Sequence, residues 1–294
     1  MPDSYFKYLS VTGAIAVLSN GTLRWTTCPN FNDPSDMQID LGVDFDRDEI
    51  AARTLDLMWR RCEGHALPAE SAIAQILDHN RGAWLALGRQ AFDEQLRPGI
   101  YASLDKVRTA TKKFCDELRG PLTTSKVICF SARKDSILMW SHYAEAHSGL
   151  VLEFRDVLGM DSPYKMAKPI IYSARAPQFA DAIELSCLLA GESKIDKVIF
   201  DRMVYTKAAE WSYEEEWRLQ SGQGREPGKP YEDVPFGVEE LHAVYFGCKA
   251  TQATKNLLQP LIRHAYPNAE IWHVRRETHT YELAFDQMRV DELV

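Results

Sequence analysis

The sequence predicts an α+β fold in which a single mixed-sheet domain, residues 1–294, carries a helical insertion. Three observations support this prediction. The chain of 294 residues is 45% hydrophobic and 26% charged, a balance typical of a globular protein with a substantial core. Short apolar runs with strand-like patterns are interleaved with helix-like stretches along the chain. From about residue 45 to residue 120 the apolar positions recur at helical spacing, which indicates the insertion.

The N-terminal elements follow from local patterns. Residues 5–10 (YFKYLS) alternate like a short strand, and residues 11–21 (VTGAIAVLSNG) have helical spacing that ends at an Asn-Gly pair. Residues 22–28 (TLRWTTC) are again strand-like. Residues 29–36 (PNFNDPSD) are expected to form a loop, because Asn, Asp and Pro favour turns and the residue before a proline avoids the helical region.

The C-terminal half predicts a further series of alternating elements. A flexible Gly/Pro loop is expected at residues 222–230 (GQGREPGKP). Helices are expected at 136–147, within 176–208 and at 251–267, and strands at 125–135, 150–154, 168–173, 214–221, 241–247 and 269–276.

The net charge and the cysteine spacing limit the ligands and the cellular compartment that we expect for this protein. The net charge is 34 − 42 = −8, so a nucleic acid or dinucleotide would need a local cluster of Lys and Arg. The six cysteines form no CxxC pair, which predicts free thiols in a reducing cytoplasm. The N-terminus has no signal-peptide pattern, and no apolar run approaches the ~20 residues of a membrane span. We therefore expect a cytoplasmic protein that does not contact a membrane.

Three histidine and glutamate side chains lie close together in residues 139–147 (MWSHYAEAH). His142 and His147 are five residues apart, whereas zinc-binding histidines on a helix are four apart. Glu145 lies two residues from His147 and points elsewhere on a helix. No metal is predicted here, and both a packing role and a ligand-contacting role remain open for the histidines.

The segment 211–219 (WSYEEEWRL) carries two glutamates at strand spacing. On a strand Glu214 and Glu216 share a face with Arg218. Neighbouring carboxylates repel, so one pKa rises unless a cation such as Arg218 or Lys207 neutralises the pair. An exposed edge strand, or salt bridges in a core, would also explain the pattern. The flanking aromatics, Trp211 among them, indicate partial burial and favour a site.

The segment FNDPSD, residues 31–36, has two possible interpretations. It forms a turn stabilised by an Asx side chain, or it lines a cleft with Asn32 and Asp33 as donors and acceptors. The chain contains no GxGxxG, GxxxxGK[ST] or GxSxG motif, so a nucleotide-binding glycine loop and a serine-hydrolase elbow are not expected.

Five blocks of the sequence, taken in order, resemble one bacterial family. They are FKYLS, LRWTTCPNFNDPSD, ICFSARKDSILMWSHYAEAHSGLVLEF, YTKAAEWSYEEEWRL and VYFG. Together they look like the family known as domain of unknown function 2971, over about residues 5–250 and excluding the helical stretch. This resemblance names a family but no activity.

The order of the elements is also similar to that of ADP-ribosyltransferase-like folds. In such enzymes an early-strand residue and a Ser/Thr-bearing strand hold NAD, and a late glutamate stabilises the oxocarbenium-like ribose. The resemblance implies that Glu216 is the catalytic carboxylate and that Glu214 orients it or the acceptor. Tyr8 would grip the NAD ribose, although such enzymes usually have His or Arg there. The Ser/Thr element is Ser131 or the pair Thr26-Thr27.

On this interpretation NAD is the substrate and the acceptor is a protein or a nucleic acid. Cations would pair with the pyrophosphate, aromatic rings would stack on nicotinamide or adenine, and polar side chains would line the cleft. These residues are Lys7, Arg24 and Arg218 for the pyrophosphate, Trp140, Tyr143 and Trp211 for stacking, and Asn32, Asp33, His142 and His147 for the cleft.

Two alternatives come from other classes. A metal-dependent nucleotide or nucleic-acid hydrolase would use Asp33, Asp36, His142 and Glu214 around a divalent ion. A non-catalytic sensor or partner-binding module would use its surface instead. The biological role that we expect for this protein is that of a bacterial toxin or a phage-defence effector.

Overall fold

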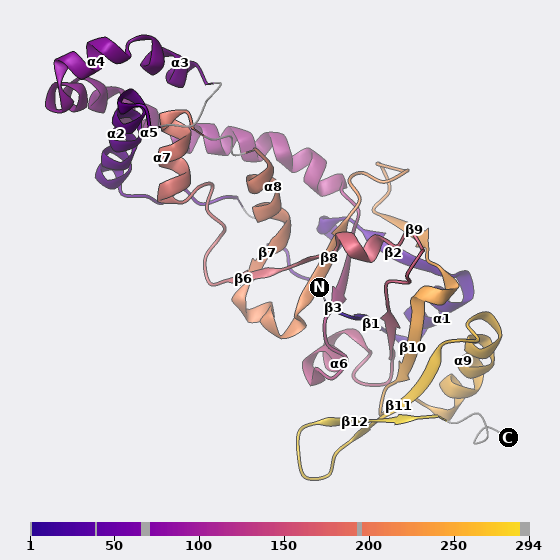
Figure 1. Ribbon diagram of the computed structural model, residues 1–294. Helices are drawn as coiled ribbons and strands as arrows, with labels where there is room; N and C mark the ends of the chain where they lie inside the picture. Colours follow the sequence, from indigo (N-terminus) through magenta and orange to yellow (C-terminus); the bar gives the residue numbers. More distant parts are fainter. Residues whose placement is uncertain (1, 39, 66–70, 193–195, 289–294) are drawn as a thin grey trace. The chain divides into compact units, whose positions relative to one another are not determined.

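The computed structural model describes residues 2–38, 40–65, 71–192 and 196–288. The chain forms two compact units, one of residues 1–36, 121–174 and 207–294 and the other of residues 37–120 and 175–206. Mixed strands and helices confirm the predicted α+β class. Figure 1 shows the elements of both units.

The first unit is built on a mixed sheet with the order β12-β11-β10-β4-β1-β3-β2-β9, in which β8 also pairs with β3 and with β5. Strands β10 and β11 are parallel and the other pairs are antiparallel. The strands are β1 Tyr5–Leu9, β2 Thr22–Thr26, β3 Val127–Ser131, β4 Leu150–Phe154, β5 Lys168–Pro169, β8 Glu216–Gln220, β9 Tyr231–Pro235, β10 Leu241–Phe246, β11 Glu270–Arg276 and β12 Leu283–Gln287. A separate two-stranded sheet pairs β6 Ile171–Ser173 with β7 Thr206–Ala208.

The centre of this sheet is β4, all five residues of which are buried. Because side chains alternate along a strand, Leu150 and Leu152 join one core cluster and Val151 joins another. Helices α1 Val11–Asn20 and α9 Gln252–Ala265 contribute to the first cluster, and α6 Ile137–Tyr143 contributes to the second. The sheet is therefore covered on both faces near β4 (Figure 1).

Capping residues explain where the first helix begins and ends. The Ser10 hydroxyl accepts a hydrogen bond from the Gly13 N–H, and Gly21 ends α1 in the left-handed region with φ 62°. This confirms the helix end expected at the Asn-Gly pair. The short helix places β2 antiparallel to β3, at Thr26 opposite Val127.

The second unit is helical in its described residues apart from loops and a bridge between Gly42 and Gln178. Helix α2 packs against α3, α4 and α7, and the helices expected between residues 45 and 120 are present. The bounds are α2 Arg47–Glu63, α3 Ala72–His79, α4 Arg81–Leu87, α5 Arg89–Thr124, α7 Ala182–Ala190 and α8 Asp196–Tyr205. Within the described ranges, every helix is too short or too polar to cross a lipid bilayer.

Several predicted elements differ from the structure in their bounds, and the strand expected at 125–135 covers only Val127–Ser131. The strand expected at 214–221 starts at Glu216, because residues 209–214 form a 3-10 helix and Glu215 has φ 42°. The helix expected at 136–147 ends at Tyr143, because residues 145–147 all have positive φ. The strand expected at 168–173 is interrupted at Ile170. Strands β7, β9 and β12 were not expected, and β7 lies at the end of the range 176–208 that was expected to be helical.

The turn after α6 depends on a glycine. Residues 145–147 have φ of 50°, 50° and 72°, and the chain then returns to β4 through Gly149. A Cβ on Gly149 would lie 2.1 Å from the Leu9 carbonyl oxygen. Glu145 lies in the same turn and caps the start of α1. Its carboxylate accepts a hydrogen bond from the Val11 N–H.

Candidate functional site

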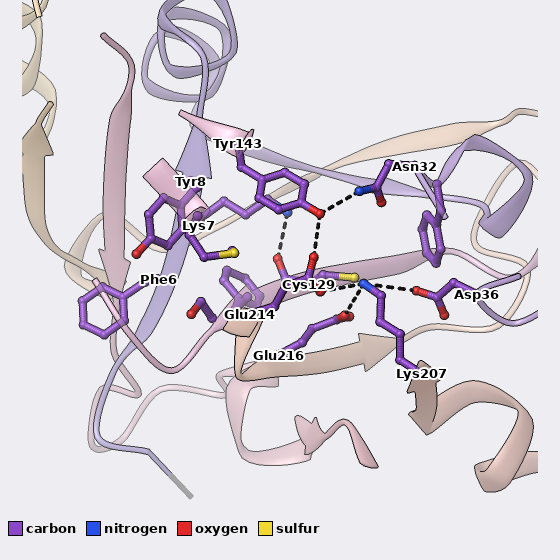
Figure 2. Close-up of a pocket in the computed structure, with 14 residues that line it drawn as sticks. Phe6, Lys7, Tyr8, Asn32, Asp36, Cys129, Tyr143, Lys207, Glu214 and Glu216 are labelled. Carbon is purple, nitrogen blue, oxygen red and sulfur yellow. Dashed lines mark hydrogen bonds and ion pairs between the residues drawn. The ribbon is translucent and has the colours of Figure 1, made fainter. Parts of the chain in front are cut away.

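A pocket with a volume of about 110 Å³ lies in the first unit, where β1 and β3 are paired at a single position, Phe6 opposite Ser131 (Figure 2). A water molecule needs roughly 10–15 Å³ by the same measure, so the pocket has room for several waters. Its polar walls include Lys7, Asn32, Asp36, Ser131, Lys207, Glu214 and Glu216, and its aromatic walls are Phe6, Tyr8, Phe31, Phe130 and Tyr143.

Five charged side chains form a buried cluster along one wall of the pocket. Lys207 Nζ lies 2.6 Å from Glu214 Oε2, 3.2 Å from Glu216 Oε2 and 3.6 Å from Asp36 Oδ2. Arg218 donates two hydrogen bonds to the Asp36 carboxylate, at 2.9 and 2.8 Å, and a third to Glu216 Oε1 at 2.8 Å. The five residues are between 0% and 7% exposed. Three carboxylates against two cations leave a charge of 2 − 3 = −1.

A further cation lines the pocket close to this cluster. The Lys7 ammonium donates a hydrogen bond of 2.8 Å to the Cys129 carbonyl oxygen. Burial lowers the pKa of Lys7, although Glu216 and Glu214 oppose this shift. With Lys7 protonated and all three carboxylates ionised, the pocket is electrically neutral.

The two glutamates differ in the direction of their pKa shifts. Burial raises the pKa of Glu214; Lys207 opposes the shift, Glu216 reinforces it, and the pKa remains raised. Burial also disfavours the ionised form of Glu216, but Arg218 and Lys207 outweigh it and hold the pKa of Glu216 at about 2. One pocket therefore contains a carboxylate whose pKa is lowered beside one whose pKa is raised, an arrangement found in acid–base sites and also in structural ion-pair networks.

A hydrogen-bonded chain links the FNDPSD loop to Glu214. The Asn32 side-chain amide donates to the Tyr143 hydroxyl at 2.7 Å, and that hydroxyl donates to Glu214 Oε1 at 2.5 Å. Asp33 instead accepts from the Ser35 N–H at 2.8 Å, as in an Asx turn. The loop is thus both a turn, through Asp33, and a pocket wall, through Asn32 and Asp36 (Figure 2).

The local backbone explains why two glutamates reach the pocket and the one between them does not. Glu214 ends the 3-10 helix, Glu215 adopts φ 42°, and Glu216 begins β8. The Glu215 side chain is exposed and pairs with Arg133 at 3.2 Å. The strand spacing from which the shared face was predicted is absent at Glu214, but the turn brings both carboxylates to Lys207.

The structure brings together part of the predicted set of site residues. Lys7, Tyr8, Asn32, Ser131, Tyr143, Glu214 and Glu216 line the pocket. Arg218 lies behind the wall and holds Asp36 and Glu216, while Arg24 pairs with Asp233 at 2.9 Å. Trp211 lies beside the cluster, with its ring 4.9 Å from Lys207 Nζ.

The two histidines and Trp140 lie outside the lining of this pocket. His142 Nδ1 is 3.0 Å from the Tyr213 hydroxyl on an exposed side of α6. Trp140 is fully buried, donates from its indole N–H to the Lys134 carbonyl oxygen at 2.7 Å, and stacks on His147. The packing role left open for the histidines therefore fits His147.

Two residues of the pocket and its charged cluster were not expected there from the sequence. Asp36 was considered only as a metal ligand, and it proves to be the partner of Arg218, 182 positions away. Cys129 also lines the pocket and lies two positions before Ser131 on β3, with Phe130 between them. Because side chains alternate along a strand, the sequence could have shown that Cys129 and Ser131 share a face. Burial raises the pKa of the Cys129 thiol, which keeps it protonated.

The geometry gives no ligand set for a metal ion. In the part of the chain that the structure describes, no group of three or more His, Cys, Asp or Glu side chains is arranged to hold one. Of the four proposed hydrolase ligands, Asp36 and Glu214 are paired with cations, Asp33 forms the turn, and His142 contacts Tyr213.

Fold and pocket together define an α+β protein with a small pocket whose wall holds five buried, charged side chains. Residues 139–219 match the model of a family described as Protein of unknown function (DUF2971), which confirms the predicted resemblance over this segment. The segment runs from α6 to β8 and contains Tyr143, Lys207 and both pocket glutamates. A search of curated proteins and a search of solved structures each gave no match.

Proposed function

We propose that the pocket binds the nicotinamide end of NAD and that the protein cleaves the nicotinamide–ribose bond, transferring ADP-ribose to an acceptor. One observation carries this proposal. Residues from three separate blocks of the sequence, Tyr8 on β1, Ser131 on β3 and the glutamates flanking Glu215 at the start of β8, line the same pocket.

The chemistry of the pocket supports a nicotinamide ligand. At about 110 Å³ the pocket is smaller than the roughly 150 Å³ cavity that admits benzene, so it would take only part of the nicotinamide ring, and the pyrophosphate and adenosine would extend outside it. The aromatic rings of Tyr8, Phe31 and Tyr143 offer stacking surfaces. The nicotinamide ring of NAD carries a positive charge, and the pocket places two carboxylates, Glu214 and Glu216, in its lining.

The two glutamates would divide the chemistry. Glu216, with a pKa of about 2, is negative at neutral pH and would stabilise the positive charge that develops on the ribose. Arg218 and Lys207 hold this carboxylate in place, so little reorganisation is needed. The bond between ribose C1′ and the nicotinamide nitrogen breaks, and its electron pair leaves with nicotinamide. The acceptor then bonds to C1′ and gives its proton to Glu214.

The acceptor is proposed to be a protein or a nucleic acid. With a net charge of −8, the protein as a whole repels polyanions, which favours a protein acceptor. In a bacterial cell such a transfer would suit a toxin or a phage-defence effector.

The test is incubation of the purified chain with NAD, with and without candidate acceptors, followed by measurement of released nicotinamide and of ADP-ribose added to the acceptor by mass spectrometry. Glu214→Gln and Glu216→Gln should each lower the rate by about a hundredfold or more. Glu215→Gln is the matched control, because Glu215 is exposed and pairs with Arg133 outside the pocket. It should leave the rate within about twofold of the unmodified protein.

Two results would count against the proposal. If the unmodified chain releases no nicotinamide with any acceptor, NAD cleavage is excluded; if Glu215→Gln loses as much activity as Glu216→Gln, the pocket is not the site. A second candidate is favoured by the ion pairs that already occupy Glu216: a sensor that binds NAD without cleaving it. Calorimetric binding of NAD without nicotinamide release, lost in Tyr143→Phe but kept in Glu215→Gln, would identify this function.

A further inference from the structure

A second pocket lies wholly within the helical unit. Its volume is about 260 Å³, and side chains of α2, α3, α4, α5 and α7 line it. Eight of its ten lining residues are apolar, the other two are Gly99 and Ser103, and none of the ten carries a charge. Three features of this pocket are unexplained by packing of the unit alone.

The first feature is Gly99 in the interior of α5. A glycine inside a helix destabilises it relative to alanine, because the chain loses more freedom on folding. Close packing does not require this glycine, since no atom lies within 4 Å of the place a Cβ would take. Its effect is to leave space in the pocket wall.

The second feature is the indole of Trp84, which lines the pocket. Its Nε1 is buried and has no hydrogen-bond partner among the residues described, although buried indole N–H groups usually have one. The Ser103 hydroxyl does not serve it, because that hydroxyl donates to the Gly99 carbonyl oxygen at 2.9 Å. The wall of the pocket therefore contains a buried hydrogen-bond donor without a partner among the described residues.

The third feature is the exposure of two isoleucines on α3. Ile73 and Ile76 line the pocket and are 41% and 58% exposed. Single exposed apolar residues are ordinary, but apolar residues that border an apolar pocket are typical of ligand sites. A bound molecule would cover them and fill the space beside Gly99.

We propose that this pocket binds an uncharged, largely apolar small molecule that carries one hydrogen-bond acceptor. The molecule is uncharged because the lining offers no counter-ion, and burying an unpaired charge is costly. Its acceptor takes the hydrogen bond of the Trp84 indole. A cavity of about 150 Å³ admits benzene, so by proportion 260 Å³ admits a molecule of about ten carbon atoms.

The test uses two ten-carbon bicyclic probes, 1-tetralone, which has a carbonyl acceptor, and tetralin, which has none. Their dissociation constants for the full chain are measured by ligand-observed NMR titration. Gly99→Leu fills the pocket and should weaken binding of both probes more than tenfold. Gly120→Leu is the matched control, because Gly120 lies in the same helix, also adjoins a proline, and has open space where a Cβ would lie outside this pocket.

A third variant separates the hydrogen bond from the apolar contact. Trp84→Phe should weaken 1-tetralone about two- to tenfold relative to tetralin, the range of one hydrogen bond. Should Gly99→Leu fail to fold, Ser103→Leu blocks the same pocket from the next turn of the helix. The proposal is overturned if neither probe binds saturably, or if both bind equally well to the filled variants. A protein that binds neither probe but forms a dimer disrupted by Ile76→Glu would show that a second copy covers the pocket.

Discussion

Replacing Glu216 with glutamine is expected to destabilise the protein far more than the same replacement at Glu214. Arg218 and Lys207 lower the pKa of Glu216 from the usual 4.5 to about 2. At about 1.36 kcal/mol per unit, the ionised form of Glu216 contributes about 3 kcal/mol to folding at neutral pH. Because the folded pKa is depressed, this contribution is present above pH 4.5 and is lost as the pH falls toward 2.

The opposite sign applies to Glu214. Its pKa is raised in the folded state, so ionisation at neutral pH opposes folding, and the stability that its proton provides is lost as the pH rises above 4.5. A neutral glutamine at this position resembles the protonated acid. Glu214→Gln keeps an uncharged acceptor beside Lys207 and is therefore expected to destabilise the protein less than Glu216→Gln.

Urea unfolding at pH 7.5, followed by near-ultraviolet circular dichroism, measures both effects. Glu216→Gln should lower the midpoint without changing the slope, since the surface exposed on unfolding is the same. Glu215→Gln serves as the control and should stay within about 0.5 kcal/mol of the unmodified protein. If Glu216→Gln unfolds at the unmodified midpoint while Glu214→Gln loses about 3 kcal/mol, the assignment of the two carboxylates is reversed and the reasoning fails.

Two further predictions concern the walls of the pocket and the turn behind it. Tyr143→Phe removes a hydrogen bond that favours ionised Glu214. The pKa of Glu214 should therefore rise further, and the free energy of unfolding should fall by about 1 kcal/mol. An unchanged titration of the Glu214 carboxyl group, followed by carbon-13 NMR, would contradict this. Gly149→Ala places a Cβ 2.1 Å from the Leu9 carbonyl oxygen and should cost about 3 kcal/mol or more. Gly82→Ala, where the new Cβ meets nothing within 4 Å, should be neutral or stabilising by up to about 1 kcal/mol. Thermal unfolding that ranks these two variants the other way would refute the steric argument.

The elements of the first unit were predicted best where the pattern of apolar residues in the sequence matches the pattern of buried residues in the structure. Strand β4 is buried along its whole length, and its apolar run LVLEF shows this directly. Strand β9 alternates between exposed and half-buried residues, so its sequence YEDVP carries no apolar signal. The ends of elements were less predictable, because Glu215 and His147 adopt positive φ in response to tertiary contacts that no local pattern reveals.

The candidate site was predicted in part for a related reason. Spacing placed Glu214 and Glu216 together and suggested Lys207 or Arg218 as the neutralising cation, and the structure shows both cations in contact with Glu216. The contact between Arg218 and Asp36 joins positions 182 residues apart, and only the folded sheet brings them together. His147 is of a residue type that often contacts ligands. Its position, however, is determined by the turn between α6 and β4.

The energetics of the cluster indicate what it contributes to the protein. The roughly 3 kcal/mol attributed to ionised Glu216 is not a net gain in stability, since Arg218 and Lys207 also lose their hydration when they are buried. Replacing buried ion pairs with apolar side chains is often neutral or stabilising, so folding alone does not call for five charged groups in this place. The arrangement does orient two carboxylates at the wall of a pocket. Both lie within 3.2 Å of one ammonium group, and their pKa values are shifted in opposite directions. Acid–base sites commonly use such an arrangement, and this supports the proposal that these residues form a site.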